Sequence, residues 1–176
     1  MEPSVVRKYD ITSKSYDELY SEEQFLKYNF IFSKLGVALG YDVADIGCGT
    51  GLLYEFLKNI SKRSPMRYLC IDASEGMIRK AIRKNPNDPR IVFIVSYAEN
   101  LPLKDNSVDD AVMITVWDNL ENPSEAVNEL KRISRNNVLV TKHSKTASPS
   151  PITFDNSFQR IGVLIDEVYI LRKRYL

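Results

Sequence analysis

Short apolar runs alternate along this chain with segments in which apolar residues recur every three or four positions. The short runs are typical of buried strands, and the spaced segments are typical of helices with one buried face. Strands are predicted over 41–46, 67–72, 91–97, 109–117 and 136–143. Helices are predicted over 52–62, over 75–84 with Ser74 as N-cap, and from Pro123 and Ser124 through 134.

In the first 40 residues, the apolar positions follow the helical spacing and not the short runs that are typical of strands. Apolar and aromatic residues recur at near-helical intervals from Leu19 to Leu35, and Gly36 is a plausible helix stop. We therefore expect a mostly helical N-terminal segment over 1–40, followed by a core over 41–143 in which strands and helices alternate.

The C-terminal segment, 144–176, has a weaker pattern. Residues 144–151 form a predicted loop rich in Ser and Pro, and a short helix is predicted near 155–161. The next run, VLIDEVYIL, fits either one long strand or a hairpin that turns near Asp166 and Glu167.

Alternating strands and helices predict an α/β fold with a mainly parallel central sheet covered on both faces. The strand region at the C-terminal end is predicted to be shortened. With 176 residues and no linker or internal repeat, we expect a single domain over 1–176. Ligands of such sheets bind beyond the carboxyl ends of the strands.

Composition narrows the class of protein. A hydrophobic content of 44% and a charged content of 27% are typical of a globular chain, and no apolar run is long enough to span a membrane. The charged start is not expected to act as a signal peptide. Cys48 and Cys70 form no CxxC motif, so reduced thiols and a cytoplasmic protein are expected. With one His and two Cys, no metal site is expected.

Net charge is +1, but it is unevenly distributed. Residues 1–125 carry 15 Lys/Arg against 19 Asp/Glu, whereas residues 126–176 carry 9 against 4. A basic end can favour RNA or another anionic partner, and it can equally be an ordinary solvated surface. An RNA or protein partner therefore stays open.

The most informative segment is VADIGCGTG at 43–51, followed by CIDAS at 70–74. A strand ending in an acid, a glycine-rich turn, a helix and a second strand ending in an acid make one βαβ unit with a ligand loop. A P-loop needs GxxxxGK[ST], which is absent. A dinucleotide site needs GxGxxG, and its third glycine would fall at Leu52.

The remaining pattern resembles the class I S-adenosylmethionine-dependent methyltransferases, specifically the type 11 methyltransferase domains. The resemblance runs from about Tyr9 to Leu139 and rests on ordered blocks. These blocks are YDITSKSYDELY, DIGCGTG, CIDAS followed by Met77, AENLPLKDNSVDDAV, and WDNLENPSEAVNELKRI. The resemblance implies a Rossmann-like methyltransferase fold, S-adenosylmethionine as cofactor, and transfer of the methyl group of this cofactor to an acceptor.

The resemblance also implies which residues hold the cofactor. Asp45 would orient the glycine loop and face the cationic methionine end of the ligand. Bare backbone at Gly47, Gly49 and Gly51 would let the ligand approach closely. Cys48 belongs to this loop and is given no chemistry of its own.

The turn after the second strand would bind the adenosine part. The Asp72 carboxylate has about four acceptor sites and can take both ribose hydroxyls. The alternative is that this acid only caps a turn. Ala73, Ser74 and Met77 would form the wall around the adenine.

Later segments would complete the site. Ala98 and Glu99 begin a loop that reads the adenine edge, and Tyr97 stands where many relatives have an Asp. This tyrosine could contact the adenine or be a core aromatic. Thr115 and Val116, at the end of the fourth strand, lie where methyl donor and acceptor meet.

No catalytic residue is identified. Asn119 stands where many relatives carry a His, and His143 is expected to cap a strand rather than to catalyse. Tyr16 could close over the cofactor or lie in the core. The acceptor, whether tRNA, protein or a small molecule, is unidentified. The alternative function is a non-catalytic methyltransferase-like binding subunit of a heteromeric complex.

Overall fold

The computed structural model describes residues 3–60 and 65–173. Seven strands form one sheet in the order β3-β2-β1-β4-β5-β7-β6. The strands are β1 (Asp42–Ile46), β2 (Arg67–Asp72), β3 (Ile91–Val95), β4 (Val108–Met113), β5 (Ser134–His143), β6 (Gln159–Val163) and β7 (Asp166–Arg172). Strands β3, β2, β1, β4 and β5 are parallel, and β7 runs antiparallel between β5 and β6.

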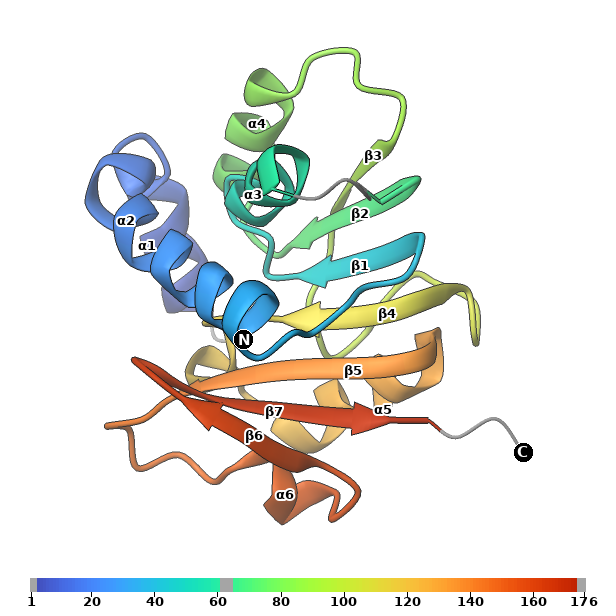
Figure 1. Cartoon of the computed structure of the whole chain (residues 1–176). Coiled ribbons are helices and arrows are strands. Elements are labelled where there is room, and N and C mark those ends of the chain that lie inside the picture. The colour runs from blue at the N-terminus through green and yellow to red at the C-terminus, as the bar shows by residue number, and fades with distance from the viewer. Residues whose placement is uncertain (1–2, 61–64, 174–176) are drawn as a thin grey trace.

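Helices cover both faces of the sheet (Figure 1). The helical elements are α1 (Pro3–Thr12), α2 (Tyr16–Tyr28), the π-helix η1 (Asn29–Lys34), α3 (Leu52–Ile60), α4 (Glu75–Lys84), the 3₁₀ helix η2 (Trp117–Asn119), α5 (Pro123–Ile133) and α6 (Pro151–Phe154). Side chains of α3, α4 and η1 share one buried cluster with alternate strand positions. Side chains of α5 and the loop before β4 share the cluster on the other face.

The N-terminal helices lie at one end of the sheet. In Figure 1 the arrowheads of β1, β2 and β4 point toward α1 and α2, and the arrowhead of β7 points the opposite way. This arrangement brings the N-terminal helices to the carboxyl ends of the parallel strands, where α/β sheets bind ligands. The α/β fold with a mainly parallel sheet is confirmed.

Most predicted elements occur close to their expected places. The strand over 67–72 and the helix over 75–84 have the predicted bounds, and Ser74 caps α4 by accepting from the Met77 N–H. The helix predicted over 52–62 is α3, and its last two predicted residues lie outside the described part of the chain. Gly36, the expected helix stop, follows η1 with a φ of +68°.

Two expectations about secondary structure need correction, and one open alternative is decided. Instead of a helix near 155–161, the chain forms the four-residue α6 from Pro151 and then enters strand β6. Of the two alternatives for the C-terminal run, the hairpin is confirmed, with its turn at 164–165, and β6 and β7 bring the sheet to seven strands. The strand predicted over 109–117 ends at Met113, because Thr115 turns the backbone into the left-handed region.

Candidate cofactor site

The glycine loop between β1 and α3 folds back over the end of β2. The N–H groups of Gly47 and Cys48 both donate to the carbonyl of Ile71, at 2.7 and 3.1 Å. Gly47 has a φ of +75°, and a Cβ there would lie 2.1 Å from Val116 Cγ2. A side chain is therefore excluded at Gly47 by Val116, which lies three residues after the end of β4. The loop and the end of β4 are in direct contact.

Gly49 differs from Gly47 in what it faces. Its φ is +54°, but a Cβ at this position would meet no atom of the described chain within 4 Å. Its N–H donates to Asp72 Oδ2 at 2.9 Å. Gly49 therefore presents bare backbone to an open space while Asp72 fixes its orientation.

Asp72 joins the two turns of the βαβ unit. Oδ2 accepts from Gly49, and Oδ1 accepts from the Ser74 N–H at 2.8 Å. An ionised carboxylate has about four acceptor sites, so these bonds leave about two for a ligand. Burial raises the pKa of this carboxyl to about 6. The turn-capping role considered for Asp72 thus exists, and it is compatible with ligand binding.

A cavity lined by twelve residues opens beside this loop. Predicted site residues in its lining are Tyr16, Gly47, Gly49, Asp72, Ser74, Met77, Thr115 and Val116. The other four residues of the lining are Val6, Tyr9, Ile114 and Asn119. None of them was a predicted cofactor contact, although Asn119 was noted at the position where many relatives carry a His. Residues from α1, α2, the glycine loop, the start of α4 and the end of β4 therefore surround one space.

Helix α1 covers this cavity and is fastened to α4. The Asp10 carboxylate accepts from Ser74 Oγ at 2.6 Å and from the Gly76 N–H at 2.9 Å. The Asn119 side chain donates to the Tyr9 hydroxyl at 3.3 Å, and the rings of Tyr9 and Tyr16 lie 6.3 Å apart. Burial raises the pKa of both tyrosines, so they stay neutral at physiological pH.

Several predicted site residues lie outside the cavity lining. Asp45 is buried behind the loop, where its Oδ2 accepts from the Tyr68 hydroxyl at 2.5 Å and burial raises its pKa to about 7. Gly51 lies close to Ala81 of α4. The remaining ones are Cys48, Ala73, Tyr97, Ala98 and Glu99. Of these, Tyr97 is 43% exposed and Ala98 is buried in the core.

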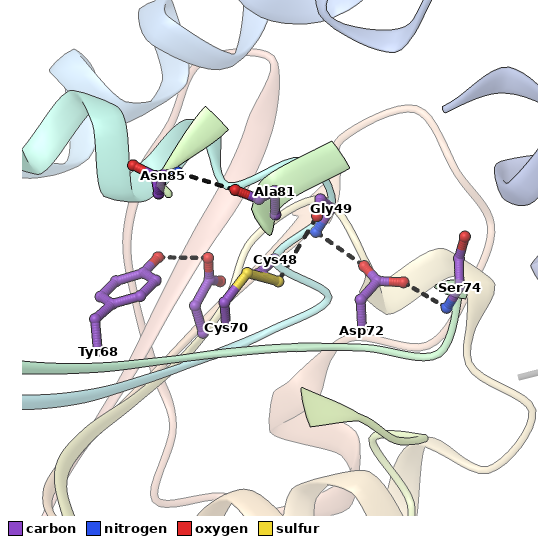
Figure 2. Close-up of a disulfide and its surroundings, with 9 residues drawn as sticks. Cys48, Gly49, Tyr68, Cys70, Asp72, Ser74, Ala81 and Asn85 are labelled. Atoms are coloured by element: carbon purple, nitrogen blue, oxygen red, sulfur yellow. Dashed lines mark hydrogen bonds between the residues drawn. A yellow bond between two sulfur atoms is a disulfide. The ribbon is translucent and has the colours of Figure 1, made fainter. Parts of the chain in front are cut away.

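The expectation of reduced thiols is wrong for this structure. Cys48 and Cys70 form a disulfide, with their Cα atoms 5.3 Å apart. The cause lies in the register of the sheet, which pairs Asp45 with Cys70 while the loop folds back over β2. Figure 2 shows the disulfide close to Gly49 and Asp72. The expected cytoplasmic location rested on reduced thiols and loses that support.

His143 holds a turn, in agreement with the expected structural role. Its Nδ1 accepts from the Lys145 N–H at 3.1 Å, and its own backbone N–H donates to Asp118 Oδ2 at 2.9 Å. Within 3–60 and 65–173, no group of three or more His, Cys, Asp or Glu could hold a metal ion. No helix in these same ranges is long and apolar enough to cross a bilayer.

The raised pKa of Asp72 predicts how ligand binding depends on pH. Hydroxyl groups donate to the ionised carboxylate, so protonation of Asp72 should weaken binding of an adenosine ligand. We expect its affinity to be constant above pH 7 and to fall as the pH drops through about 6.

Calorimetry between pH 5 and 8 measures this change. Asp45, which titrates near pH 7, and the Asp10 carboxylate also lie close to the loop and the turn. The fall near pH 6 should therefore persist in Asp45→Asn and in Asp10→Asn. An affinity that stays constant down to pH 5 would contradict the role of Asp72.

Comparison with known sequences agrees with the geometry of the loop. A family model described as "Methyltransferase domain" matches residues 44–140, more than half of the chain. The chain belongs to this family, the class I S-adenosylmethionine-dependent methyltransferase domains, and the cofactor of this family is S-adenosylmethionine.

Individual relatives of this chain have low sequence identity to it. A thiol S-methyltransferase of Mus musculus is 27% identical over 79% of this chain. A ubiquinone/menaquinone biosynthesis C-methyltransferase of Hahella chejuensis is 29% identical over 83% of it. The chain spans 56% and 59% of the lengths of these two relatives.

A solved structure supports the fold over nearly the full chain. It is a putative S-adenosylmethionine-dependent methyltransferase of Methanococcus maripaludis, with a TM-score of 0.76 and 18% identity. The match covers 97% of this chain and 94% of the other. At this identity the comparison supports the fold alone.

Proposed function

We infer that this chain binds S-adenosylmethionine in the cavity at the glycine loop and transfers the methyl group to an acceptor. The observation that carries the inference is the position of Asp72. It lines the cavity while accepting one N–H from the glycine loop and one from the turn before α4. One carboxylate thereby sets the relative positions of the two segments that would hold the methionine and adenosine parts.

Five residues of the cavity lining have a proposed role toward a particular part of the cofactor. Asp72 accepts from the ribose hydroxyls, and Ser74 and Met77 form the wall around the adenine. Gly49 lets the methionine part pass close to the backbone, and Thr115 lies at the methyl end. The remaining proposed contacts come from Tyr16, Ala73, Tyr97, Ala98, Glu99 and Val116, and from Asp45, Gly47, Cys48 and Gly51 of the loop region.

The chemistry needs little from the protein. A lone pair of the acceptor forms a bond to the methyl carbon while the carbon–sulfur bond breaks. The sulfur keeps that electron pair and becomes the neutral thioether of S-adenosylhomocysteine. Because the leaving group is already activated by its positive charge, orientation of the two reactants can supply roughly 7–11 kcal/mol of the barrier lowering. The chain therefore needs to hold donor and acceptor in line.

The choice of cofactor is the first test. Calorimetry should show binding of S-adenosylmethionine and S-adenosylhomocysteine and none of NAD. The reason is that Leu52 stands where a dinucleotide loop needs its third glycine. Tighter binding of NAD than of S-adenosylhomocysteine would refute the assignment.

The acceptor is the open part of the proposal. The two sequence relatives are named for thiol S-methylation and for ubiquinone/menaquinone biosynthesis, and each is much longer than this chain. An RNA or protein acceptor was suggested by the basic C-terminal segment. There, the Lys173 amino group donates to the carbonyls of Lys131 and Ser134 at the end of α5, so it is committed to a helix cap.

A methyl-transfer screen addresses the acceptor and the alternative function together. Labelled S-adenosylmethionine is incubated with the isolated chain and with RNA, protein or small-molecule fractions of an extract. Transfer by the isolated chain would exclude a purely non-catalytic binding subunit. A cytoplasmic location remains a proposal that cell fractionation can check.

A further inference from the structure

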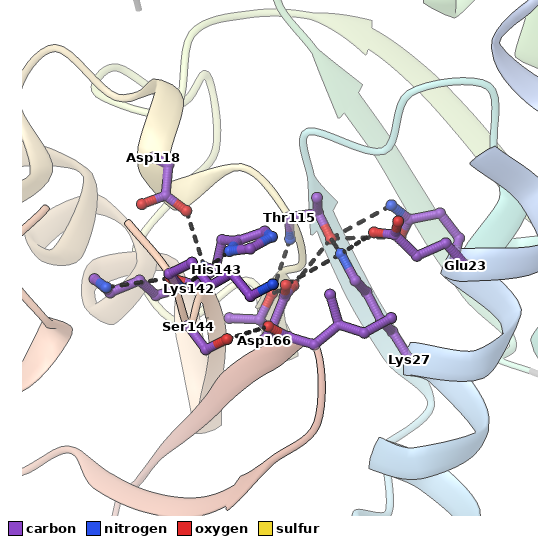
Figure 3. Close-up of polar contacts among 12 residues, drawn as sticks. Glu23, Lys27, Thr115, Asp118, Lys142, His143, Ser144 and Asp166 are labelled. Atoms are coloured by element: carbon purple, nitrogen blue, oxygen red, sulfur yellow. Dashed lines mark hydrogen bonds and ion pairs between the residues drawn. The ribbon is translucent and has the colours of Figure 1, made fainter. Parts of the chain in front are cut away.

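A lysine is buried at the end of α2, next to the cofactor cavity. Lys27 is 2% exposed, and its amino group meets three acceptors (Figure 3). These are Glu23 Oε1 at 2.8 Å, Asp166 Oδ1 at 3.1 Å and Thr115 Oγ1 at 3.2 Å. The contact with Thr115 is a hydrogen bond, and the contacts with Glu23 and Asp166 are ion pairs. Lys27 is thereby committed to joining α2 to β7 and to the end of β4.

Asp166 completes this junction from the first position of β7. It is 3% exposed, and its Oδ2 accepts from Thr141 Oγ1 at 2.9 Å and from Thr115 Oγ1 at 3.2 Å. Thr141, which is fully buried in β5, accepts in turn from the Thr115 N–H at 2.8 Å. Thr115 is therefore held at its backbone by Thr141 and at its hydroxyl by Lys27 and Asp166.

Thr115 needs such support because its backbone is unusual. Its φ is +62°, and a β-branched residue in the left-handed region is a genuine outlier that persists only when its surroundings enforce it. Thr115 and both of its neighbours, Ile114 and Val116, line the cavity. Val116 also packs against Gly47 of the glycine loop. The conformation at Thr115 thus sets the shape of this end of the cavity.

A buried ion pair is not the most stabilising way to attach α2 to the rest of the fold. Burying two charges costs solvation, and apolar residues of similar size often stabilise a fold equally well. Helix α2 already packs on α3 through aromatic side chains, with the rings of Tyr28 and Phe56 5.5 Å apart. What the pair adds is a direct hold on Thr115, because its hydroxyl accepts a hydrogen bond from Lys27 and donates one to Asp166 Oδ2.

We propose that Lys27 and Asp166 are positioning residues for methyl transfer. They hold Thr115 in its left-handed conformation and so fix the end of the cavity at which the methyl group meets its acceptor. This proposal rests on the proposed function, because it takes the cavity to be the S-adenosylmethionine site with Thr115 at the methyl end.

The test compares two cofactor analogues in the full chain. S-adenosylhomocysteine lacks the methyl group, whereas sinefungin carries an amine-bearing carbon at the position of the methylated sulfur. Lys27→Met and Asp166→Asn should lower the affinity for sinefungin about tenfold more than the affinity for S-adenosylhomocysteine, measured by calorimetry. Asp166→Asn keeps the shape of the side chain and answers the question if Lys27→Met fails to fold.

Two further variants separate positioning from attachment of α2. Lys84→Met removes another ion pair to α2, since Lys84 contacts Asp17 at 2.8 Å and Glu55 at 2.9 Å. It should leave the ratio of the two affinities unchanged. Glycine adopts positive φ without strain, so in a Thr115→Gly background Lys27→Met should no longer alter that ratio.

The outcomes are distinct. The positioning role would be overturned if Lys27→Met and Asp166→Asn lowered the affinities for the two analogues equally. It would also be overturned if Lys27→Met changed the ratio of the two affinities to the same extent in the Thr115→Gly background. If the unmodified chain binds neither analogue, the proposed function fails and the positioning role fails with it. The proposal would be established if Lys27→Met selectively lowered the affinity for sinefungin and this selectivity disappeared in the Thr115→Gly background.

Discussion

Gly49→Val is expected to weaken binding of S-adenosylhomocysteine at least roughly a hundredfold. The added side chain would project into the open space beside the loop, since no atom of the described chain lies within 4 Å of a Cβ at this position. A cofactor that passes close to the backbone would collide with it. Calorimetry gives the affinity, and thermal unfolding shows whether the fold survives.

Gly36→Val is the matched control for this substitution. Gly36 has a φ of +68° and open space around its Cβ position, but it lies outside the cavity lining. Both variants carry the strain of a β-branched residue at positive φ, on the order of 1–3 kcal/mol. Gly36→Val should lose stability to a similar extent and keep its affinity. Equal affinities in the two variants would show that the ligand does not approach Gly49.

Asp72→Ala is expected to weaken cofactor binding by about 1.5–3 kcal/mol, the usual scale for hydrogen bonds to a charged group. The loss has two physical sources. The ribose hydroxyls lose their acceptor, and the N–H groups of Gly49 and Ser74 lose theirs. Isothermal calorimetry with S-adenosylhomocysteine measures the combined effect.

Asp88→Ala provides a matched comparison. This loop carboxylate accepts from the Tyr54 hydroxyl at 2.8 Å and from Arg90, and it lies outside the cavity lining. Removing it should reduce stability and leave affinity unchanged. If Asp72→Ala retained full affinity, Asp72 would be only a turn cap, and the ribose assignment would be wrong.

The elements predicted best were those whose signals are local. Strand β2 and helix α4 have the predicted bounds, because an apolar run ends at Asp72 and Ser74 can cap the next helix by itself. The glycine loop could also be predicted from the sequence, since its positive φ values depend on the glycines within it.

The C-terminal hairpin shows where local signals fail. Strand β6 lies at the edge of the sheet, and its burial follows no strict alternation. Its conformation depends on hydrogen bonds to β7, which the sequence pattern of 159–163 does not encode. The helix expected near 155–161 was therefore wrong.

The disulfide is a second case. Cys48 and Cys70 are 22 residues apart in sequence and belong to no spacing motif. Only the parallel register of β1 and β2, together with the fold-back of the loop, brings the two sulfur atoms together.

The sequence by itself determined the βαβ unit, the class of fold and the loop that points to S-adenosylmethionine. These follow from hydrophobic periodicity and from residues whose backbone preferences act within a few positions. The tertiary structure alone decided which distant side chains complete the site. Tyr9 meets Asn119 across 110 positions and Lys27 meets Thr115 across 88, because packing of α1 and α2 on the strand ends makes such contacts, and no local preference encodes them.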